Sequence, residues 1–170
     1  MPRALVITVS TRAAAGVYPD RSGPVLVQLL RDAGWQVDGP DIVPDGEPVG
    51  SRLRAAVAAG YDVVLTTGGT GISPTDRTPQ LTAGVLDYEI PGIAEALRFA
   101  GWQSGVPTAL LSRGVAGVAG RTLIINLAGS PGAVRDGMRV IGPLLDHAVS
   151  QLHGEDHVSA GPEPDAKEGR

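Results

Sequence analysis

The sequence predicts an α/β fold with a mostly parallel sheet, and two observations carry this prediction. The apolar runs at residues 4–9 and 62–67 are continuous rather than alternating, as in strands that are covered on both faces. Stretches with helical spacing lie between the apolar runs and end at glycines. Glycine (24) and proline (14) are abundant, but 42% of the 170 residues are hydrophobic and come in periodic blocks, so we expect one folded domain with a substantial core.

The composition excludes several classes of site and partner. The chain contains no cysteine, so disulfides, thiolate metal sites and thiol nucleophiles are impossible. A net charge of −4 argues against a general nucleic-acid binder, which needs a basic face. The N-terminus enters a strand almost at once, and no apolar run approaches the length of a membrane span. We therefore expect a cytoplasmic enzyme or binding protein.

The first half of the chain alternates strands and helices. The central strand at residues 4–9 leads into a polar loop at residues 10–21. A helix follows at residues 24–33, with Ser22 suited to the N-cap and Gly34 placed to end it.

Three further elements complete this half. Residues 35–44 form a short strand that is interrupted at Gly39-Pro40, and a helix at residues 49–59 stops at Gly60. Residues 62–67 then form a second central strand, so the pattern is that of parallel βαβ units.

The second half contains a predicted hairpin. After helices at residues 79–86 and 93–100, strands at residues 108–115 and 121–127 are joined by a turn at residues 117–120. An antiparallel strand at this place makes the sheet mixed.

A long helix and a tail end the chain. The helix covers residues 133–151 and bends near Gly142-Pro143. The domain therefore spans residues 1–152, and the polar residues 153–170 form a disordered tail. The three histidines have no spacing typical of metal ligands.

A glycine-rich loop at residues 65–79 is the first candidate for a functional site. Gly68, Gly69 and Gly71 permit positive φ angles and close approach of a ligand, so they can aim successive N–H groups at one anion. The threonine hydroxyls nearby add donors (Thr66, Thr67 and Thr70). Asp76 supplies a carboxylate, and the next helix begins at Thr78-Pro79, with the threonine at the N-cap.

This pattern fits a phosphate site, and it also fits a simple tight turn after a parallel strand. The two best-known phosphate loops are excluded, because the sequence lacks G-x-x-x-x-G-K-[ST] and the first strand is followed by residues 10–13 (STRA) rather than by G-x-G-x-x-G. A Walker ATPase and an ordinary Rossmann dehydrogenase are therefore disfavoured.

Asp45 is the second candidate acid, because it follows directly on a strand. From that position it can face Asp76 across the crevice at the carboxyl ends of the strands and help to hold a divalent cation such as Mg²⁺. The neighbouring acids Asp38, Asp41 and Glu47 are better explained by a solvated turn with an N-cap function for the next helix.

A second glycine-bearing turn follows the strand at residues 121–127. Ser130 is placed as an N-cap and Pro131 as the first helical residue, directly after Gly129. The N–H groups at a helix N-terminus attract anions, although a well-capped turn explains the same residues. Two such turns in one sheet favour a shared phosphate-rich ligand.

The chain resembles the family of molybdenum-cofactor biosynthesis proteins that includes MogA, MoaB and the G domain of gephyrin. The resemblance covers most of residues 4–150 and rests on five segments in the same order, which are residues 9–10 with 16–24 (GVYPDRSGP), 42–45 (IVPD), 65–79 (LTTGGTGISPTDRTP), 111–113 (LSR) and 126–134 (NLAGSPGAV).

The resemblance implies a fold and an assembly. It implies a three-layer α/β/α domain with a mostly parallel sheet, assembled as a trimer. It also implies use of Mg²⁺ and ATP to adenylylate molybdopterin at its terminal phosphate, with release of pyrophosphate.

The same resemblance assigns roles to individual residues. The catalytic and metal-binding acids fall on Asp45 and Asp76. The substrate- and nucleotide-binding positions fall on Ser10, Asp20, Ser22, Thr67, Gly68, Gly69, Thr70, Gly71, Gly129, Ser130 and Pro131. Two positions depart from the family pattern, because Arg77 follows Asp76 where the arginine usually precedes the acid, and Ala128 replaces the usual proline.

Two other functions are compatible with these residues. A MoaB-like relative binds the pterin or nucleotide without catalysis and serves as a carrier or as a partner of other cofactor-pathway proteins. A nucleotide-dependent hydrolase on the same fold cleaves ATP without the pterin. Retention of both aspartates favours the adenylyltransferase.

Overall fold

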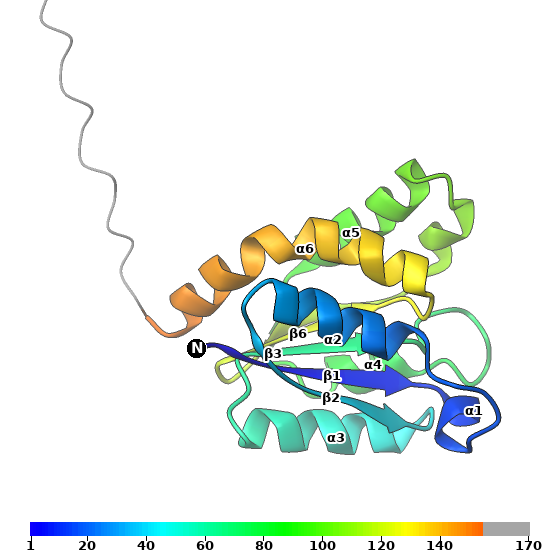
Figure 1. Cartoon of the computed structure of the whole chain (residues 1–170), viewed down its shortest axis with the longest axis horizontal. Coiled ribbons are helices and arrows are strands. Elements are labelled where there is room, and N and C mark those ends of the chain that lie inside the picture. Colours follow the sequence, from blue (N-terminus) through cyan, green and yellow to red (C-terminus); the bar gives the residue numbers. More distant parts are fainter. Residues whose placement is uncertain (155–170) are drawn as a thin grey trace, which may run out of the picture.

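The computed structural model describes residues 1–154, and these residues form a mixed six-stranded sheet in the order β2-β1-β3-β6-β5-β4 (Figure 1). The strands are β1 (Arg3–Val9), β2 (Gln36–Val43), β3 (Val63–Thr67), β4 (Tyr88–Glu89), β5 (Ala116–Ala119) and β6 (Thr122–Leu127). The helices are α1 (Thr11–Ala14), α2 (Ser22–Asp32), α3 (Glu47–Ala58), α4 (Thr78–Ala83), α5 (Pro91–Gln103), the 3₁₀ helix η1 (Pro107–Leu111) and α6 (Pro131–Leu152).

The first four strands in the sheet order are parallel, whereas β5 runs antiparallel to β6 and β4 antiparallel to β5. The predicted α/β class and the mixed sheet are therefore confirmed. No helix within residues 1–154 is long and apolar enough to cross a membrane.

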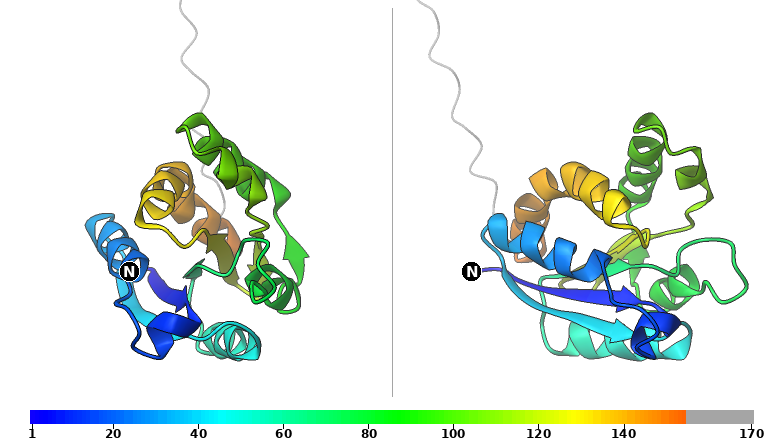
Figure 2. Two further views of the ribbon diagram at one scale, coloured as in Figure 1. Left: turned by 90° about the vertical axis from the view of Figure 1, so that its right-hand side faces the viewer. Right: turned by 45° about the vertical axis from the view of Figure 1, so that its right-hand side comes forward.

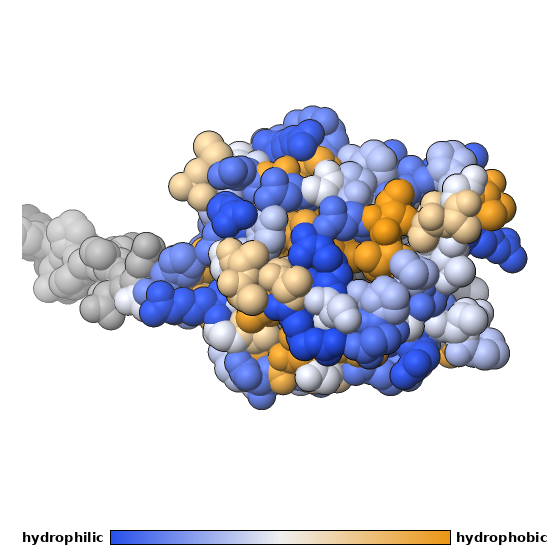
Figure 3. All heavy atoms as spheres, turned by 90° about the horizontal axis from the view of Figure 1, so that it is seen from below, coloured by the Kyte–Doolittle hydropathy of each residue, from blue (hydrophilic) through white to orange (hydrophobic). Residues whose placement is uncertain are grey.

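Helices cover both faces of the sheet and make three layers (Figures 1 and 2). In β1, Ala4 and Val6 pack into a core with α2, α5 and α6, while Leu5 and Ile7 pack into a second core with α3. All four side chains are fully buried, which explains why this strand reads as a continuous apolar run. Seen from below, hydrophobic residues lie in separate groups between hydrophilic ones (Figure 3).

The predicted strand at residues 108–115 is wrong. Residues 107–111 form η1, in which Leu110 and Leu111 are half exposed. The strand is instead β5, which includes three of the four residues that were expected to form the turn. A Cβ atom on Gly117 would lie 2.3 Å from the Tyr88 carbonyl oxygen, so the close approach of β4 requires glycine here.

Two predicted helix caps are also wrong, and one is right. Ser22 and Thr78 are the first residues of α2 and α4 rather than their N-caps. Instead, the Gly23 N–H at the start of α2 donates a hydrogen bond to Asp20 Oδ1 (3.0 Å). Ser130 is the N-cap of α6 as predicted, since its Oγ accepts from the Ala133 N–H (3.1 Å).

Several boundaries differ from the prediction. β2 is one continuous strand whose pairing with β1 shifts between Leu5 and Ile7. The polar loop after β1 contains the short helix α1, with Ser10 as its N-cap. Of the predicted tail, only His153 and Gly154 lie within the described residues, and they directly follow α6.

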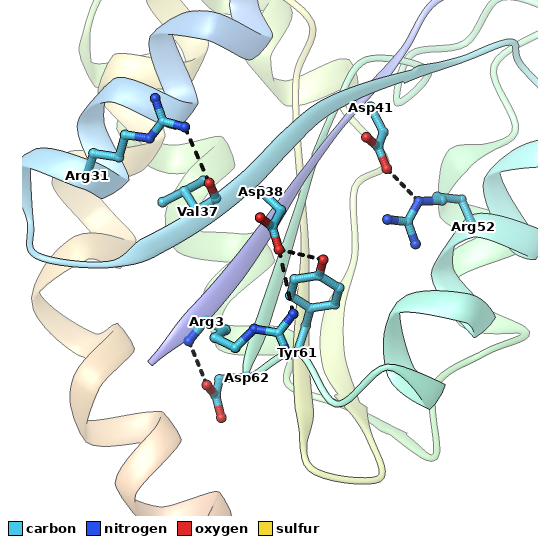
Figure 4. A network of polar contacts seen from close by, with 8 residues as sticks. All are labelled: Arg3, Arg31, Val37, Asp38, Asp41, Arg52, Tyr61 and Asp62. Atoms are coloured by element: carbon cyan, nitrogen blue, oxygen red, sulfur yellow. Dashed lines mark hydrogen bonds and ion pairs between the residues drawn. The ribbon is translucent and has the colours of Figure 1, made fainter. Parts of the chain in front are cut away.

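The acids expected to form a solvated turn make specific contacts instead (Figure 4). Asp41 pairs with Arg52 (2.6 Å), and Asp38 accepts a hydrogen bond from the Tyr61 hydroxyl (2.7 Å). Neither caps α3, whose N-cap is Gly46. The hydrogen bond to Asp38, together with burial, raises the pKa of Tyr61 above its usual 10.0.

Both ends of the described chain meet at one carboxylate. Asp62 Oδ2 accepts from the Arg3 N–H (2.7 Å), and Asp62 Oδ1 lies 2.7 Å from His153 Nε2. In Figure 1, the N-terminus and the last turn of α6 accordingly lie at the same edge of the sheet.

Candidate functional site

The carboxyl ends of β1, β2, β3 and β6 open into a cavity of about 950 Å³ (Figure 2, left panel, looks onto this edge). Eleven of the predicted site residues line it: Ser10, Asp20, Ser22, Asp45, Thr67, Gly68, Gly69, Asp76, Gly129, Ser130 and Pro131. The structure therefore brings together residues from loops that are far apart in sequence.

The glycine loop crosses between this cavity and a neighbouring groove of about 460 Å³. Thr70 and Gly71, the two remaining predicted residues, line the groove rather than the cavity. Gly68 and Gly69 line both, so a ligand in one space lies next to a ligand in the other.

Gly68 and Gly69 adopt positive φ angles (+101° and +67°). A Cβ atom on Gly68 would lie 2.3 Å from the Val9 carbonyl oxygen, and one on Gly69 would lie 2.3 Å from Thr78 Oγ1. Gly71 has no positive φ, but a Cβ atom there would lie 2.8 Å from Asp76 Oδ2. Gly68 and Gly69 therefore need glycine, whereas a Cβ atom at Gly71 would require only that the Asp76 side chain move.

Three consecutive amides of this loop are available to a ligand. Within residues 1–154, the N–H groups of Gly69, Thr70 and Gly71 donate to no protein acceptor. The expectation for Gly68 is wrong, because its N–H donates to the Leu127 carbonyl (3.0 Å) and fixes the loop to the end of β6. Unpaired amides in a glycine turn form an anion-binding concavity.

The two candidate acids lie on the same cavity and are each held through one oxygen. Asp45 Oδ2 accepts from the hydroxyl (2.7 Å) and the N–H (3.2 Å) of Thr11, and Asp76 Oδ2 accepts from the Ser73 N–H (3.1 Å). Oδ1 of each carboxylate accepts no hydrogen bond within the described part of the chain.

This donor set fits Mg²⁺ better than a metal that needs a full protein cage. Residues 1–154 contain no group of three or more histidine or acidic side chains that could hold a metal ion. Mg²⁺ is typically held by one or two carboxylates together with substrate phosphates and water, so Asp45 and Asp76 would hold it only with a phosphate ligand present.

The N-terminal loop is held in place by its own predicted site residues. Asp20 Oδ2 accepts from the Thr8 hydroxyl (2.7 Å), and Ser10 Oγ lies 3.1 Å from the Tyr18 hydroxyl. The Thr67 hydroxyl is within hydrogen-bond distance of Ser22 Oγ (3.1 Å) and of the Ala128 carbonyl (2.9 Å). These contacts fix three loops to one another around the cavity.

The sequence reasoning missed the role of Arg113. Its backbone N–H donates to the Thr70 carbonyl, its Nε to the Gly71 carbonyl and its Nη2 to the Asp76 carbonyl, each at 2.8 Å. Arg113 thus clamps the glycine loop and the acid together. One arginine in the segment at residues 111–113 carries no local signal for this function.

Thr66 does not reach the site, contrary to expectation. It is fully buried on the opposite face of β3, and its hydroxyl accepts a hydrogen bond from Asn126 Nδ2 (3.0 Å). The same Nδ2 donates to Thr82 (3.0 Å), and Asn126 Oδ1 accepts from the Val115 N–H (3.1 Å). This buried network fixes β6 to α4 behind the site.

The cavity and the groove differ in their basic side chains. Two arginines, Arg12 and Arg21, line the cavity together with three acids, whereas the charged side chains of the groove are two acids. The groove is lined by apolar residues of η1 and its neighbours, including Val106, Ala109 and Leu111, and its lining contains no lysine or arginine. An anionic ligand is therefore better matched to the cavity and an uncharged ring to the groove.

Comparison with known families gives an independent result. Residues 5–147 match a family model described as "Probable molybdopterin binding domain". The chain is 42% identical over 156 residues to a molybdenum cofactor biosynthesis bifunctional protein of Synechococcus elongatus, which covers 91% of this chain and 48% of the relative. The chain thus spans about half the length of such bifunctional relatives.

Single-domain relatives match over most of their own length. The molybdenum cofactor biosynthesis protein B of Bacillus cereus is 37% identical, with 89% of this chain and 90% of the relative covered. A molybdopterin adenylyltransferase of Helicobacter pylori is 34% identical, with 88% and 86% covered. The solved structure of a molybdopterin biosynthesis Mog protein from Mycobacterium ulcerans is 52% identical over 89% of this chain and 99% of that one, with a TM-score of 0.85.

Proposed function

Because the chain belongs to the family of molybdopterin-binding domains, we propose that it takes part in molybdenum cofactor biosynthesis as a molybdopterin adenylyltransferase. The terminal phosphate of molybdopterin attacks the α-phosphorus of ATP. A new P–O–P bond forms, the bond to the β-phosphate breaks, and pyrophosphate leaves. One observation carries the proposal: the cavity, which has two arginines and both candidate acids, meets the groove, which has no basic residue, at a loop with three unpaired amides.

The residues suit a reaction whose nucleophile is already charged. A phosphate is ionised at neutral pH, so no serine, histidine or cysteine base is required. Catalysis then consists of positioning and charge neutralisation, and the amides of Gly69, Thr70 and Gly71 are placed to supply both. Arg12 and Arg21 would bind the phosphates of the nucleotide in the cavity.

Asp45 and Asp76 are the residues that would hold Mg²⁺. When bound with the nucleotide, the ion would neutralise phosphate charge and orient the leaving group. The free Oδ1 atoms of the two carboxylates are the protein ligands available for it. Thr11 and Ser73 orient these carboxylates by hydrogen bonds to the other oxygen.

The reaction would be tested by incubating the protein with Mg²⁺, ATP and molybdopterin and detecting adenylyl-molybdopterin by mass spectrometry. Asp76→Asn should lower turnover by at least about 100-fold while the variant remains folded. Asp32→Asn is the matched control, since Asp32 lies on the exposed side of α2 and contacts Gln28. Normal turnover in Asp76→Asn would refute the role of this acid.

A non-catalytic carrier or partner protein is the second candidate, favoured by the match to protein B of Bacillus cereus over almost its whole length. The same experiment separates the two functions. Binding of molybdopterin by the wild-type protein without formation of the adenylyl product would favour the carrier. Cleavage of ATP without the pterin would indicate a hydrolase.

We also propose that the protein forms a homotrimer in the cytoplasm, where ATP is supplied for the reaction. α5 and η1 carry half-exposed apolar side chains that do not line the groove: Phe99, Trp102 and Leu110. Phe99 and Trp102 contact each other, with ring centroids 5.7 Å apart. Such a group is typical of a protein interface. Light scattering should give a trimer mass for the wild-type protein and a smaller one for Trp102→Glu.

A further inference from the structure

One acidic side chain of the groove, Asp136, has no role in the proposed reaction. Asp136 lies in the second turn of α6, and it lines both the groove and a narrow inner extension of about 60 Å³ between α5 and α6. Only 22% of its side chain is exposed. Most residues around it are small or apolar, such as Gly101 and Ala109. Arg98 also lines the inner extension, where its Nη1 donates to the Gly114 carbonyl (3.0 Å).

One oxygen of this carboxylate is available for a ligand. Asp136 Oδ1 accepts from Arg139 Nη1 (2.7 Å), and the side chain of Arg139 is 75% exposed, so this ion pair lies toward solvent. Oδ2 accepts no hydrogen bond within residues 1–154. Asp76 is the other acid that lines the groove, and the groove lining contains no lysine or arginine. A carboxylate in such surroundings needs N–H or O–H donors from its ligand.

We propose that Asp136 determines specificity for the pterin ring. This inference rests on the proposed function, because it assigns the ring of molybdopterin to the groove. The pyrimidine part of a pterin presents two adjacent donors, the ring N3–H and the 2-amino group. A carboxylate accepts both in a bidentate arrangement: one donor meets the free Oδ2, and the other meets Oδ1, which keeps a second lone pair beside its hydrogen bond with Arg139. Adenine presents a donor next to an acceptor at its equivalent edge, so the same carboxylate disfavours a nucleotide base in the groove.

The pterin ring would be held by apolar contacts on its faces and by hydrogen bonds to Asp136 at its edge. The apolar residues of η1 would contact one face of the ring, and the start of α6 would lie on the other side. The loss of a matched bidentate contact corresponds to roughly 10- to 100-fold in affinity. Arg139 lines neither the groove nor its inner extension and contacts the carboxylate only from the solvent side.

The test measures binding rather than turnover. 6-Hydroxymethylpterin and its lumazine analogue, in which a 2-oxo group replaces the 2-amino group, are titrated by their own fluorescence. The wild-type protein should prefer the pterin by about 10-fold or more. Asp136→Asn should invert this preference, because an amide presents one donor and one acceptor, which match the 2-oxo group and N3–H of lumazine.

Arg139→Gln is the matched control. It removes the ion pair but keeps the carboxylate, so it should retain the preference for the pterin. An equal loss of preference in both variants would mean that the ion pair only stabilises α6, and this result would overturn the proposal. Failure of the wild-type protein to bind either probe at millimolar concentration would also overturn it.

The outcome is distinguishable from that of the adenylylation experiment. Product formation by a protein whose pterin preference is unchanged in Asp136→Asn would contradict the role of Asp136 and leave the enzyme function intact. A preference that inverts in a protein without adenylylating activity would support Asp136 and favour the carrier function.

Discussion

The close approach of the glycine loop to β1 makes Gly68→Ala a sensitive test of the site's architecture. At Gly68 φ is +101°, and a Cβ atom would lie 2.3 Å from the Val9 carbonyl oxygen. A residue with a Cβ atom costs about 1–2 kcal/mol in the left-handed region. Displacement of a packed strand adds about 1–3 kcal/mol. The lower conformational freedom of unfolded alanine offsets about 0.4–1 kcal/mol.

The sum predicts a loss of roughly 1–5 kcal/mol in the free energy of unfolding. For a domain of this size, that corresponds to a fall of roughly 2–20 °C in the melting temperature. Urea titration followed by circular dichroism measures the free energy directly. The same variant should bind ATP more weakly, because the amides of Gly69 and Thr70 move with Gly68.

Two control variants separate the contributions. Gly34 has a φ of +89° with no atom within 4 Å of the added Cβ, so Gly34→Ala carries the conformational cost alone. Gly92 lies in α5 with neither a positive φ nor a neighbour, so Gly92→Ala should leave stability unchanged or raise it by a few tenths of a kcal/mol. If Gly68→Ala and Gly34→Ala agree within about 0.5 kcal/mol, the contact with Val9 is not the cause and the reasoning fails.

Three further variants test other parts of the molecule. Tyr61→Phe removes the hydrogen bond to Asp38 and should cost about 1 kcal/mol at neutral pH. Since the folded pKa of Tyr61 is raised, its contribution is present below about pH 10 and is lost as the pH rises through that raised pKa, so urea titrations at alkaline pH should converge for variant and wild type. Arg113→Gln removes two side-chain hydrogen bonds to the glycine loop and should raise KM for ATP more than it lowers the melting temperature; an unchanged KM would show that the clamp is dispensable. Asn126→Ala leaves three buried groups without their partner and should cost roughly 2–4 kcal/mol in calorimetry, whereas a loss below 1 kcal/mol would contradict the buried network.

The parallel part of the fold could be predicted because burial on both faces leaves a direct trace in the sequence. β1 and β3 are continuous apolar runs, and the helices between them keep their apolar residues on one face. The edge with β4 and β5 could not be predicted in the same way. In the sequence, Gly117 has the pattern of a turn residue. In the structure, glycine is required there by the close approach of the Tyr88 backbone. Because Tyr88 belongs to another element, the sequence around Gly117 gives no sign of this contact.

The functional site, too, could be predicted only in part. Glycines and acids at strand ends indicated the cavity, since the carboxyl ends of parallel strands meet at one edge. Thr66 and Thr67 are adjacent in sequence, yet only Thr67 reaches the cavity because side chains alternate along a strand. Arg113 acts through three carbonyl groups of another loop, and no residue pattern encodes that contact.

The meeting of the two ends of the described region at Asp62 makes the domain easy to place within a larger polypeptide. Arg3 and His153 contact the same carboxylate at the edge opposite the cavity. A second domain can therefore be joined at either end, or this domain inserted into a loop of another protein, without crossing the substrate entrance. The matched region makes up 48% of the Synechococcus elongatus relative and 90% of the Bacillus cereus relative, which accords with a unit that is used both alone and within longer chains.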